Sequence, residues 1–286
     1  MSGPGAEPDL GFDPRSLEPL PVDVVSVQSQ VVYGCVGNSV AVPTLQALGL
    51  NVVPVPTVLL SNTPHYDTLA GGAVPLEWFE GYLRALDERR VLRHARAVLV
   101  GYLGSPAQAA ALAAWLERAT RAKPELLVVL DPVMGDFDSG LYVDPQLPAA
   151  LRDRLVPHAT GLTPNAFEFE QLIGRPLATV AETVAAARGL LEGRTQWVVV
   201  TSAAPQEDGG GSRIVLVTSS GHEVVTWERV AYGAKGTGDL FTAAVTGALL
   251  QGAGLRDAVV AAHARVATVL ERTARLNCNE LVLTDA

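Results

Sequence analysis

Short runs of β-branched residues alternate with longer helical patterns along most of the chain, and this alternation constrains the fold more than any other feature. We expect strands at the apolar runs 22–27, 97–100, 126–130 and 197–200, each bounded by polar or turn residues. The segments between them predict helices at residues 39–48, 75–90, 105–121, 148–155, 179–192, 236–252 and 255–275. This order predicts an α/β fold of three layers, with helices on both faces of a mostly parallel central sheet.

Two further segments are expected at sheet margins. Residues 51–60 are rich in valine but contain Pro54 and Pro56, which cannot donate to a strand ladder, so this strand should lie at an edge or bend. Residues 213–218 and 223–227 are joined by a short polar turn and predict an antiparallel pair. The sheet should therefore be parallel in its middle and antiparallel late in the chain.

Composition narrows the class of protein. The formal net charge of -9 argues against a broad nucleic-acid surface, and no apolar run approaches the roughly 18 residues that a membrane helix needs. The two cysteines, Cys35 and Cys278, form neither a disulfide framework nor a metal-ligand spacing, which favours a reducing compartment. We expect a protein that binds neither nucleic acid nor membrane.

The first 21 residues differ in composition from the rest of the chain. They are rich in proline, glycine and acidic residues and lack the basic start and apolar stretch of a signal peptide. We expect a flexible leader at 1–21, one domain at 22–286 and a cytoplasmic location.

Gly236-Thr237-Gly238-Asp239, here named the glycine turn, directly precedes an apolar helical run. Glycines allow several backbone N–H groups to converge at a helix N-terminus, where the helix dipole favours an anion. Asp239 would then stand beside a bound phosphate, placed to accept a proton from a hydroxyl. The same four residues are also typical of a loop whose Thr or Asp simply caps the helix.

Polar residues follow several of the expected strands. Gln28-Ser29 follow the first strand, Asp131 follows 126–130 and Thr201-Ser202 follow 197–200. Ligands of open α/β sheets bind at these strand ends. Glu168 lies in the first turn of a helix after Asn165, where dipole complementation alone would account for it.

Taken together, these motifs resemble pyridoxal kinases of the ribokinase-like superfamily over about residues 22–271. The segments that carry the resemblance are Gln28-Ser29, Val31-Val32-Tyr33-Gly34, Gly37-Asn38-Ser39, Ser61-Asn62, Gly101-Tyr102, Asp131-Pro132-Val133-Met134-Gly135, Thr163-Pro164-Asn165 with Glu168, Thr201-Ser202 and the glycine turn. The resemblance implies ATP-dependent phosphorylation of the 5′-hydroxyl of pyridoxal, with pyridoxine and pyridoxamine as further substrates. It also implies a small edge-strand lid and a homodimer.

The resemblance assigns roles around the phosphates. Asp239 matches the general base, and Gly236, Thr237 and Gly238 match the anion hole. Asp131 and Glu168 match positions that hold Mg²⁺, directly or through water, near ATP. Asn165 would support them, and Thr201 and Ser202 match nucleotide contacts. Backbone donors, a metal ion and one base are what phosphoryl transfer requires.

On the vitamin side, the resemblance places Ser29 and Tyr102 at the substrate, with Ser29 reading the ring and Tyr102 forming a wall. Val31, within the 31–34 motif, and His65, whose imidazole can hydrogen-bond and stack on an aromatic ligand, are further candidates. Three positions depart from the family pattern. Pro64 and His65 replace the residues that the family usually has in the lid loop. A loop histidine beside a tyrosine is also typical of a solvated surface loop with no ligand. Lys235 stands where an apolar residue is usual, and its ammonium either attracts ATP phosphates or is a solvated loop lysine.

Two other functions remain open at this point. A hydroxymethylpyrimidine (phosphate) kinase shares the acidic strand end and the glycine turn, although Gln28-Ser29 and residues 31–34 favour the vitamin B6 enzyme. A non-catalytic B6-binding protein could keep the same fold, but would have no use for a base beside a phosphate site.

Overall fold

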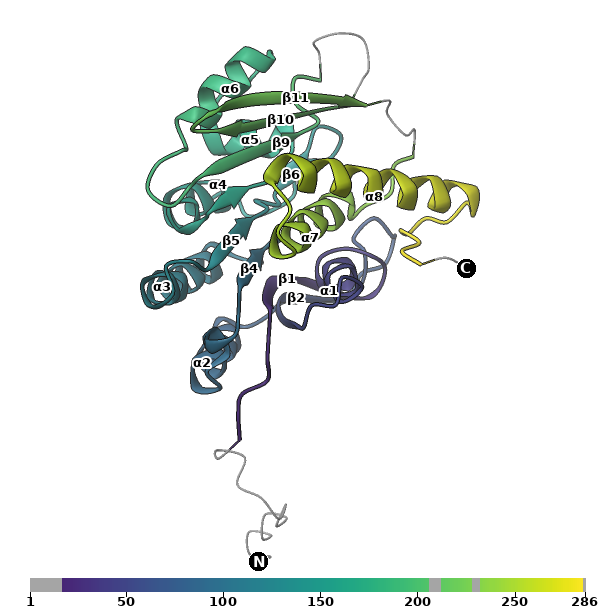
Figure 1. Cartoon of the computed structure of the whole chain (residues 1–286). Coiled ribbons are helices and arrows are strands. Elements are labelled where there is room, and N and C mark those ends of the chain that lie inside the picture. The colour runs from purple at the N-terminus through teal and green to yellow at the C-terminus, as the bar shows by residue number, and fades with distance from the viewer. Residues whose placement is uncertain (1–16, 206–211, 228–231, 285–286) are drawn as a thin grey trace, which may run out of the picture.

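The computed structural model describes residues 17–205, 212–227 and 232–284, so most of the predicted leader lies outside the described residues. Within them, nine strands form one sheet in the order β11-β10-β9-β8-β5-β4-β1-β2-β3 (Figure 1). The strands are β1 (Val24–Tyr33), β2 (Val52–Asn62), β3 (Gly71–Ala73), β4 (Ala97–Val100), β5 (Leu127–Leu130), β8 (Gly161–Leu162), β9 (Trp197–Thr201), β10 (Ser212–Thr218) and β11 (Gly221–Trp227). A separate small hairpin pairs β6 (Gly135–Asp136) with β7 (Gly140–Leu141).

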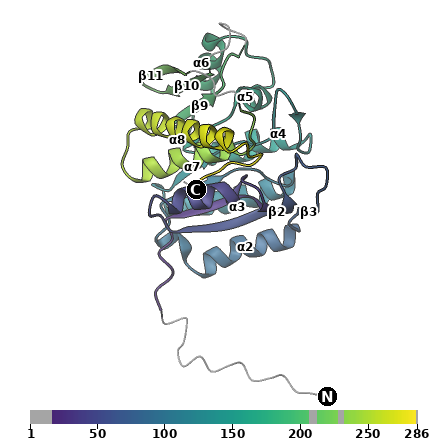
Figure 2. The same ribbon diagram turned by 90° about the vertical axis from the view of Figure 1, so that its right-hand side faces the viewer.

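The strands from β9 to β2 are parallel, and the two ends of the sheet are antiparallel. The β10–β11 pair lies at one end and β3 at the other (Figure 2). The antiparallel pair expected from residues 213–218 and 223–227 is confirmed. Parallel strands buried on both faces read as continuous apolar runs, which is why β4, β5 and β9 were predictable.

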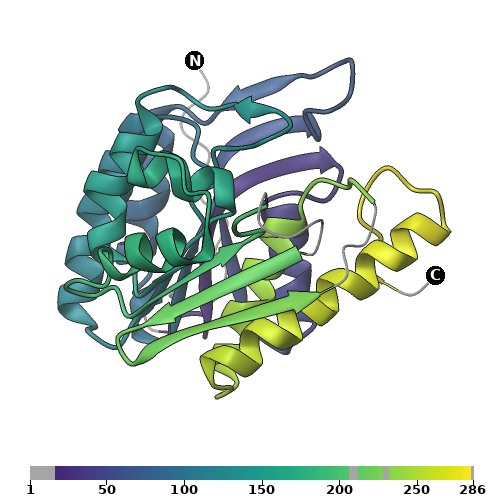
Figure 3. The same ribbon diagram turned by 90° about the horizontal axis from the view of Figure 1, so that it is seen from above.

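Helices cover both faces of the sheet (Figure 3), which confirms the three-layer prediction. The helices are α1 (Asn38–Gln46), α2 (Leu76–Glu88), α3 (Pro106–Ala122), α4 (Leu147–Ala150), α5 (Ala166–Ile173), α6 (Val180–Arg188), α7 (Thr237–Leu250) and α8 (Leu255–Arg275). Among the described residues, short helical turns also lie at Val91–Arg93, Leu151–Leu155 and Val156–His158. None of the described helices is long and apolar enough to cross a membrane.

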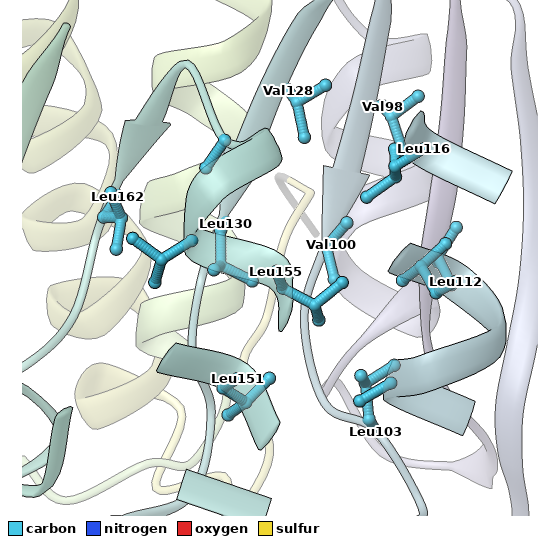
Figure 4. Close-up of a cluster of buried hydrophobic side chains, with 14 of the residues drawn as sticks. Val98, Val100, Leu103, Leu112, Leu116, Val128, Leu130, Leu151, Leu155 and Leu162 are labelled. Atoms are coloured by element: carbon cyan, nitrogen blue, oxygen red, sulfur yellow. The ribbon is translucent and has the colours of Figure 1, made fainter. Parts of the chain in front are cut away.

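Alternate residues of the central strands face opposite helix layers. Val98 and Val100 of β4 join the core shared with α3 and the turn after α4, shown in Figure 4, whereas Leu99 joins the core shared with α7 and α8. Leu112 and Leu116, four residues apart on α3, are completely buried against the first face. Each such leucine contributes roughly 1.5–3 kcal/mol by its burial.

Several element boundaries differ from the prediction. β1 continues to Tyr33 rather than ending at residue 27, with a pairing irregularity between Gln28 and Gln30. The helix expected at 148–155 is a single α-helical turn followed by wider and tighter turns. β3 and β8 were not expected, because Gly-Gly-Ala and Gly-Leu carry no strand pattern and pair only through their neighbours.

The strand containing Pro54 and Pro56 is β2, second from the edge of the sheet. The edge strand β3 pairs only with Val58, Leu59 and Leu60. Among the described strands, the half of β2 with the prolines therefore pairs with β1 on one side and with no strand on the outer side. The expectation of an edge position therefore holds for the half with the prolines and is wrong for the other half. β2 and β3 together form the small edge element.

Candidate active site

The glycine turn begins α7 with geometry that only glycine provides. Gly236 is the N-cap residue with φ 89°, and a Cβ on it would lie 1.9 Å from the carbonyl oxygen of Cys35. Among the described residues, no side chain caps this helix. The first N–H groups of α7 are therefore left without a capping side chain, and the interpretation of the turn as an ordinary capped helix start is wrong.

Asp239 lies in the first turn of α7, partly buried, with its Oδ2 accepting a hydrogen bond of 2.9 Å from the N–H of Gly37. Burial raises the pKa of Asp239 to about 6, although the Gly37 bond opposes the shift. The carboxylate is thus held by one backbone donor and is basic enough to take up a proton near neutral pH.

Asp131 follows β5 and is almost completely buried. A Cβ on Gly238 would lie 3.7 Å from its Oδ2, so Asp131 adjoins the glycine turn. The Thr242 hydroxyl donates to the same oxygen at 3.0 Å and lies 2.9 Å from the Thr163 hydroxyl. Burial and the Asp239 charge raise the pKa of Asp131 well above its usual value, and the Thr242 bond only partly offsets them.

Glu168 completes a group of three neighbouring acidic side chains. It forms a capping box with Asn165 at the start of α5, and its Oε1 accepts from the N–H of Met134 at 3.2 Å. The Asn165 side chain donates to the Gly135 carbonyl at 2.9 Å. Burial and the charge of Asp131 raise the pKa of Glu168. The capping role expected of a first-turn Glu is present, together with a place beside Asp131.

The chemistry of this acidic group fits Mg²⁺. Buried carboxylates that repel each other are unfavourable unless a cation neutralises them, and Mg²⁺ prefers hard oxygen ligands. Among the described residues, no three His, Cys, Asp or Glu side chains are arranged to hold a metal by themselves. The ion would therefore complete its shell with water and phosphate oxygens, as Mg²⁺ usually does in kinases.

The predicted nucleotide residues lie at neighbouring strand ends. Thr201 ends β9, donates its N–H to Pro164 O at 2.9 Å and forms a bridge with Asn165. Ser202 is exposed and has φ 51°, a left-handed conformation that is uncommon for a serine. Strained backbone of this kind clusters at binding sites.

Lys235 precedes the glycine turn and is paired across the site. Its Nζ donates to Asp136 Oδ2 at 2.9 Å and lies 3.4 Å from Ser139 Oγ, so it links the glycine turn to the β6–β7 hairpin. Burial opposes ionisation of Asp136, but the bonds from Lys235 and Ser139 outweigh it and lower the pKa. Lys235 is therefore an exposed loop lysine that forms an ion pair with Asp136.

Of the residues predicted for the substrate, Ser29 lies against the segment that is bonded to Asp239. A Cβ on Gly37 would lie 2.2 Å from Ser29 Oγ, and Gly37 itself donates to Asp239. Tyr102 follows β4, is half-buried and stacks on Tyr142, with ring centroids 6.5 Å apart. Burial raises the pKa of Tyr102, so its phenol stays neutral at ordinary pH.

His65 and Val31 have weaker connections to Asp239 than Ser29 has. His65 stacks on Tyr66 at 4.2 Å and helps line a cavity of about 340 Å³ with Lys235 and Asn279. Val31 is buried, and its peptide is bonded on both sides by the Ser39 hydroxyl. No described hydrogen bond or ion pair joins either side chain to the base. A larger cavity of about 570 Å³ lies at the opposite edge of the sheet and contains none of the predicted residues.

Four residues of this region were not singled out from sequence. Thr242 lies three residues after Asp239 on one helix, so helical spacing could have indicated it. Gly37 was noted only as part of the resemblance, although it holds the base. Tyr142 and Glu280 carry no local motif, and only the fold brings them to the site.

Known kinases resemble this chain in sequence over most of its length. The phosphomethylpyrimidine kinase family matches residues 38–283 of the chain. The pyridoxine/pyridoxal/pyridoxamine kinase of Bordetella bronchiseptica is 54% identical over 272 residues, which cover 95% of this chain and 96% of the relative. A pyridoxal kinase of Rubrobacter xylanophilus is 37% identical over 267 residues, covering 93% of this chain and 92% of the relative.

Solved structures of pyridoxal kinases have the same fold as this chain. The pyridoxal kinase of Leishmania donovani in complex with ADP and ginkgotoxin matches with a TM-score of 0.82 at 28% identity, covering 91% of this chain and 90% of that one. The pyridoxal kinase of Entamoeba histolytica matches in fold with a TM-score of 0.86 at 22% identity, covering 92% and 93%.

The fold is thus the ribokinase-like fold of small-molecule kinases, and its predicted class is confirmed. The chain belongs to the phosphomethylpyrimidine kinase family, and the predicted resemblance to pyridoxal kinases is confirmed by relatives that share more than half of its residues.

Proposed function

We propose that this protein transfers the γ-phosphoryl group of ATP to the 5′-hydroxyl of pyridoxal, pyridoxine and pyridoxamine. The relative from Bordetella bronchiseptica is named for all three vitamers, and the Leishmania donovani enzyme is known in complexes with ADP and pyridoxamine or pyridoxine. The observation that carries the proposal is Asp239, a carboxylate of raised pKa at an uncapped helix start.

Asp239 acts as the general base. It accepts the proton of the vitamer hydroxyl as the oxygen attacks the γ-phosphorus, so an O–P bond forms while the bond to the ADP oxygen breaks. The N–H groups at the start of α7 stabilise the charge on the transferring group. Gly37 orients the base through its 2.9 Å hydrogen bond.

Asp131 and Glu168 would hold Mg²⁺, which supplies positive charge to the ATP phosphates when bound. Thr242 orients Asp131 by donating to it, and Asn165 orients Glu168 through the capping box. Asn165, Thr201 and Ser202 contact the nucleotide in this proposal.

Lys235 assists ATP binding by charge. Its ammonium is paired with Asp136 and only partly buried, so it can exchange that partner for a phosphate. In Lys235→Ala, the KM for ATP should rise at low salt and approach the wild-type value at high salt, because salt screens exposed charges. An unchanged KM at both salt concentrations would remove this role.

The vitamer pocket consists of Ser29, Val31, Tyr102 and His65, with Asp239 at the hydroxymethyl group. Ser29 adjoins the Gly37 segment, and the Tyr102–Tyr142 stack provides a flat wall for a pyridine ring. His65 reaches the pocket from the lid loop.

For the molecule as a whole, we propose one domain at 22–286 with a leader at 1–21, a cytoplasmic location and a homodimer. Two free thiols and the use of ATP support the location. Exposed apolar side chains at the ends of β1 and β2 and just before β3 support an interface: Val32, Tyr33, Leu59 and Leu69. Light scattering after size exclusion would measure twice the chain mass.

A substrate panel tests the function. With Mg-ATP, the specificity constant should be high for B6 vitamers and low for hydroxymethylpyrimidine. Preference for the pyrimidine would favour a hydroxymethylpyrimidine (phosphate) kinase, the activity after which the family is named. Vitamer binding without ATP consumption would favour a non-catalytic binding protein.

A further inference from the structure

Glu280 lies far from the motifs in sequence but beside the site in space. After α8 the chain turns back, which places residues 277–284 beside the connection between β1 and α1 (Figure 1). The Glu280 side chain is buried, and its Oε2 accepts a hydrogen bond of 2.9 Å from the N–H of Cys35. A buried carboxylate is retained only where its bonds compensate for lost hydration.

The other carboxylate oxygen faces the loop that carries His65. Glu280 Oε1 lies 3.7 Å from His65 Nε2, and a Cβ on Gly34 would lie 2.9 Å from the same oxygen. The Tyr66 hydroxyl is close enough that burial and the Glu280 carboxylate together raise its pKa. Glu280 Oε1 and the Tyr66 hydroxyl are both buried without a hydrogen-bond partner among the described residues.

The segment held by Glu280 also holds the base. The Cys35 carbonyl packs against Gly236, and two residues later the N–H of Gly37 donates to Asp239. The peptide of Cys35 is therefore fixed on one side by Glu280 and on the other by the glycine turn.

We propose that Glu280 is a positioning residue for vitamer binding. It fixes the His65 loop and the Cys35–Gly37 segment relative to Asp239, and so shapes the vitamer side of the site. The nucleotide side, with Asn165, Thr201 and Glu168, is held by separate contacts between β5, α5 and β9. The inference rests on the proposed function, because it assigns the role to the vitamer pocket of that kinase.

Two substitutions separate positioning from general stability. In Glu280→Ala, the Cys35 N–H loses its acceptor and His65 loses its partner, so the KM for pyridoxal should rise about tenfold or more. The KM for ATP should stay within about twofold. Glu280→Gln keeps an oxygen that accepts from Cys35 but loses the charge that faces His65, so the KM for pyridoxal should rise by an intermediate amount, about threefold. Glu271→Gln, the same chemical change on the exposed surface of α8, is the control and should match the wild type.

A double-mutant cycle tests the link to the lid loop. If Glu280 acts through His65, the effects of Glu280→Gln and His65→Gln on the KM for pyridoxal should be less than additive. Circular dichroism and thermal unfolding of each variant establish that it is folded, and Glu280→Gln carries the test if Glu280→Ala does not fold.

Equal increases in both KM values, or no change in either, would overturn the role of Glu280 while leaving the kinase assignment intact. A wild-type chain that binds ADP but phosphorylates no vitamer would instead contradict the proposed function, and the inference with it.

Discussion

Among single residues, Asp239 combines the two properties that a general base requires. Its pKa is raised to about 6 by burial, so it is ionised at neutral pH yet still basic enough to accept a proton. Its orientation is fixed by Gly37, a residue 202 positions away in the chain. A typical aspartate at a helix start would be fully ionised and a much weaker base.

The pH dependence of the reaction follows from this pKa. Because the base must be unprotonated, kcat/KM for pyridoxal should be low at pH 5, rise through an inflection near 6 and level off above it. Initial rates at saturating Mg-ATP, repeated with pyridoxine, separate ionisation of the enzyme from that of the substrate. A flat profile between pH 5 and 7 with both vitamers would contradict the assignment.

The same residue should lower stability at alkaline pH. Its folded pKa of about 6 exceeds the ordinary 3.8, so protonation favours the folded state below pH 4, and this stabilisation is lost as pH rises through 6. Asp239→Asn should therefore increase the free energy of unfolding by about 1–3 kcal/mol at pH 8 and change it little at pH 4. Denaturant titrations at both pH values measure this. A lower free energy of unfolding for Asp239→Asn than for the wild type at pH 8 would contradict this prediction, because it would mean that the folded state stabilises the Asp239 charge.

At the scale of elements, the site is assembled from strand ends and one helix start. Asp131 and Asn165 follow β5 and β8, Thr201 ends the neighbouring β9, and Asp239 lies on α7. The positions of these elements depend on the backbone of the glycine turn, where Gly236 meets Cys35.

Two glycines that flank α7, Gly236 and Gly252, allow the effect of backbone strain to be separated from that of close packing. Gly236 and Gly252 have nearly the same φ, 89° and 92°, but a Cβ on Gly252 would meet no atom within 4 Å. Gly252→Ala should cost about 1 kcal/mol and leave kcat/KM unchanged. Gly236→Ala should also displace the glycine turn and reduce kcat/KM at least about a hundredfold. Similar activities of the two variants would contradict a site role for Gly236.

Sequence patterns predicted the elements with strong local signals and failed where partners are distant. The short apolar strands β4, β5 and β9 and the capped helix α3 were predicted nearly to their ends, and α6 was predicted at its capped start, because these signals are local. β3 and β8 exist only through pairing with their neighbours. Likewise Asp131, Glu168 and Asp239 lie in recognisable motifs, whereas Glu280 meets Cys35 across 245 positions and has no local signature.

At the scale of the whole molecule, folding brings three acidic side chains together from β5, α5 and α7. Burial, and after it the repulsion between these carboxylates, raises the pKa of Asp131 and Glu168, so the folded state should gain stability from a cation bound beside them. The fold thus carries a local electrostatic penalty that a bound cation would relieve.

Thermal unfolding with ADP measures that relief. Mg²⁺ should raise the unfolding midpoint beyond an ionic-strength-matched NaCl control, because a ligand at 100 times its Kd stabilises by about 2.7 kcal/mol. Asp131→Asn should lose most of this increment. The same midpoint in MgCl₂ and in matched NaCl would contradict a cation site.

The role of Asp239 in phosphoryl transfer is the central claim, and a single-turnover measurement tests it most directly. With enzyme in excess over pyridoxal and saturating Mg-ATP, Asp239→Asn should form the phosphorylated vitamer about 10² to 10⁴ times more slowly than the wild type. Pyridoxal binding, measured by titration without ATP, should remain detectable in the variant. Transfer at the wild-type rate would contradict the account.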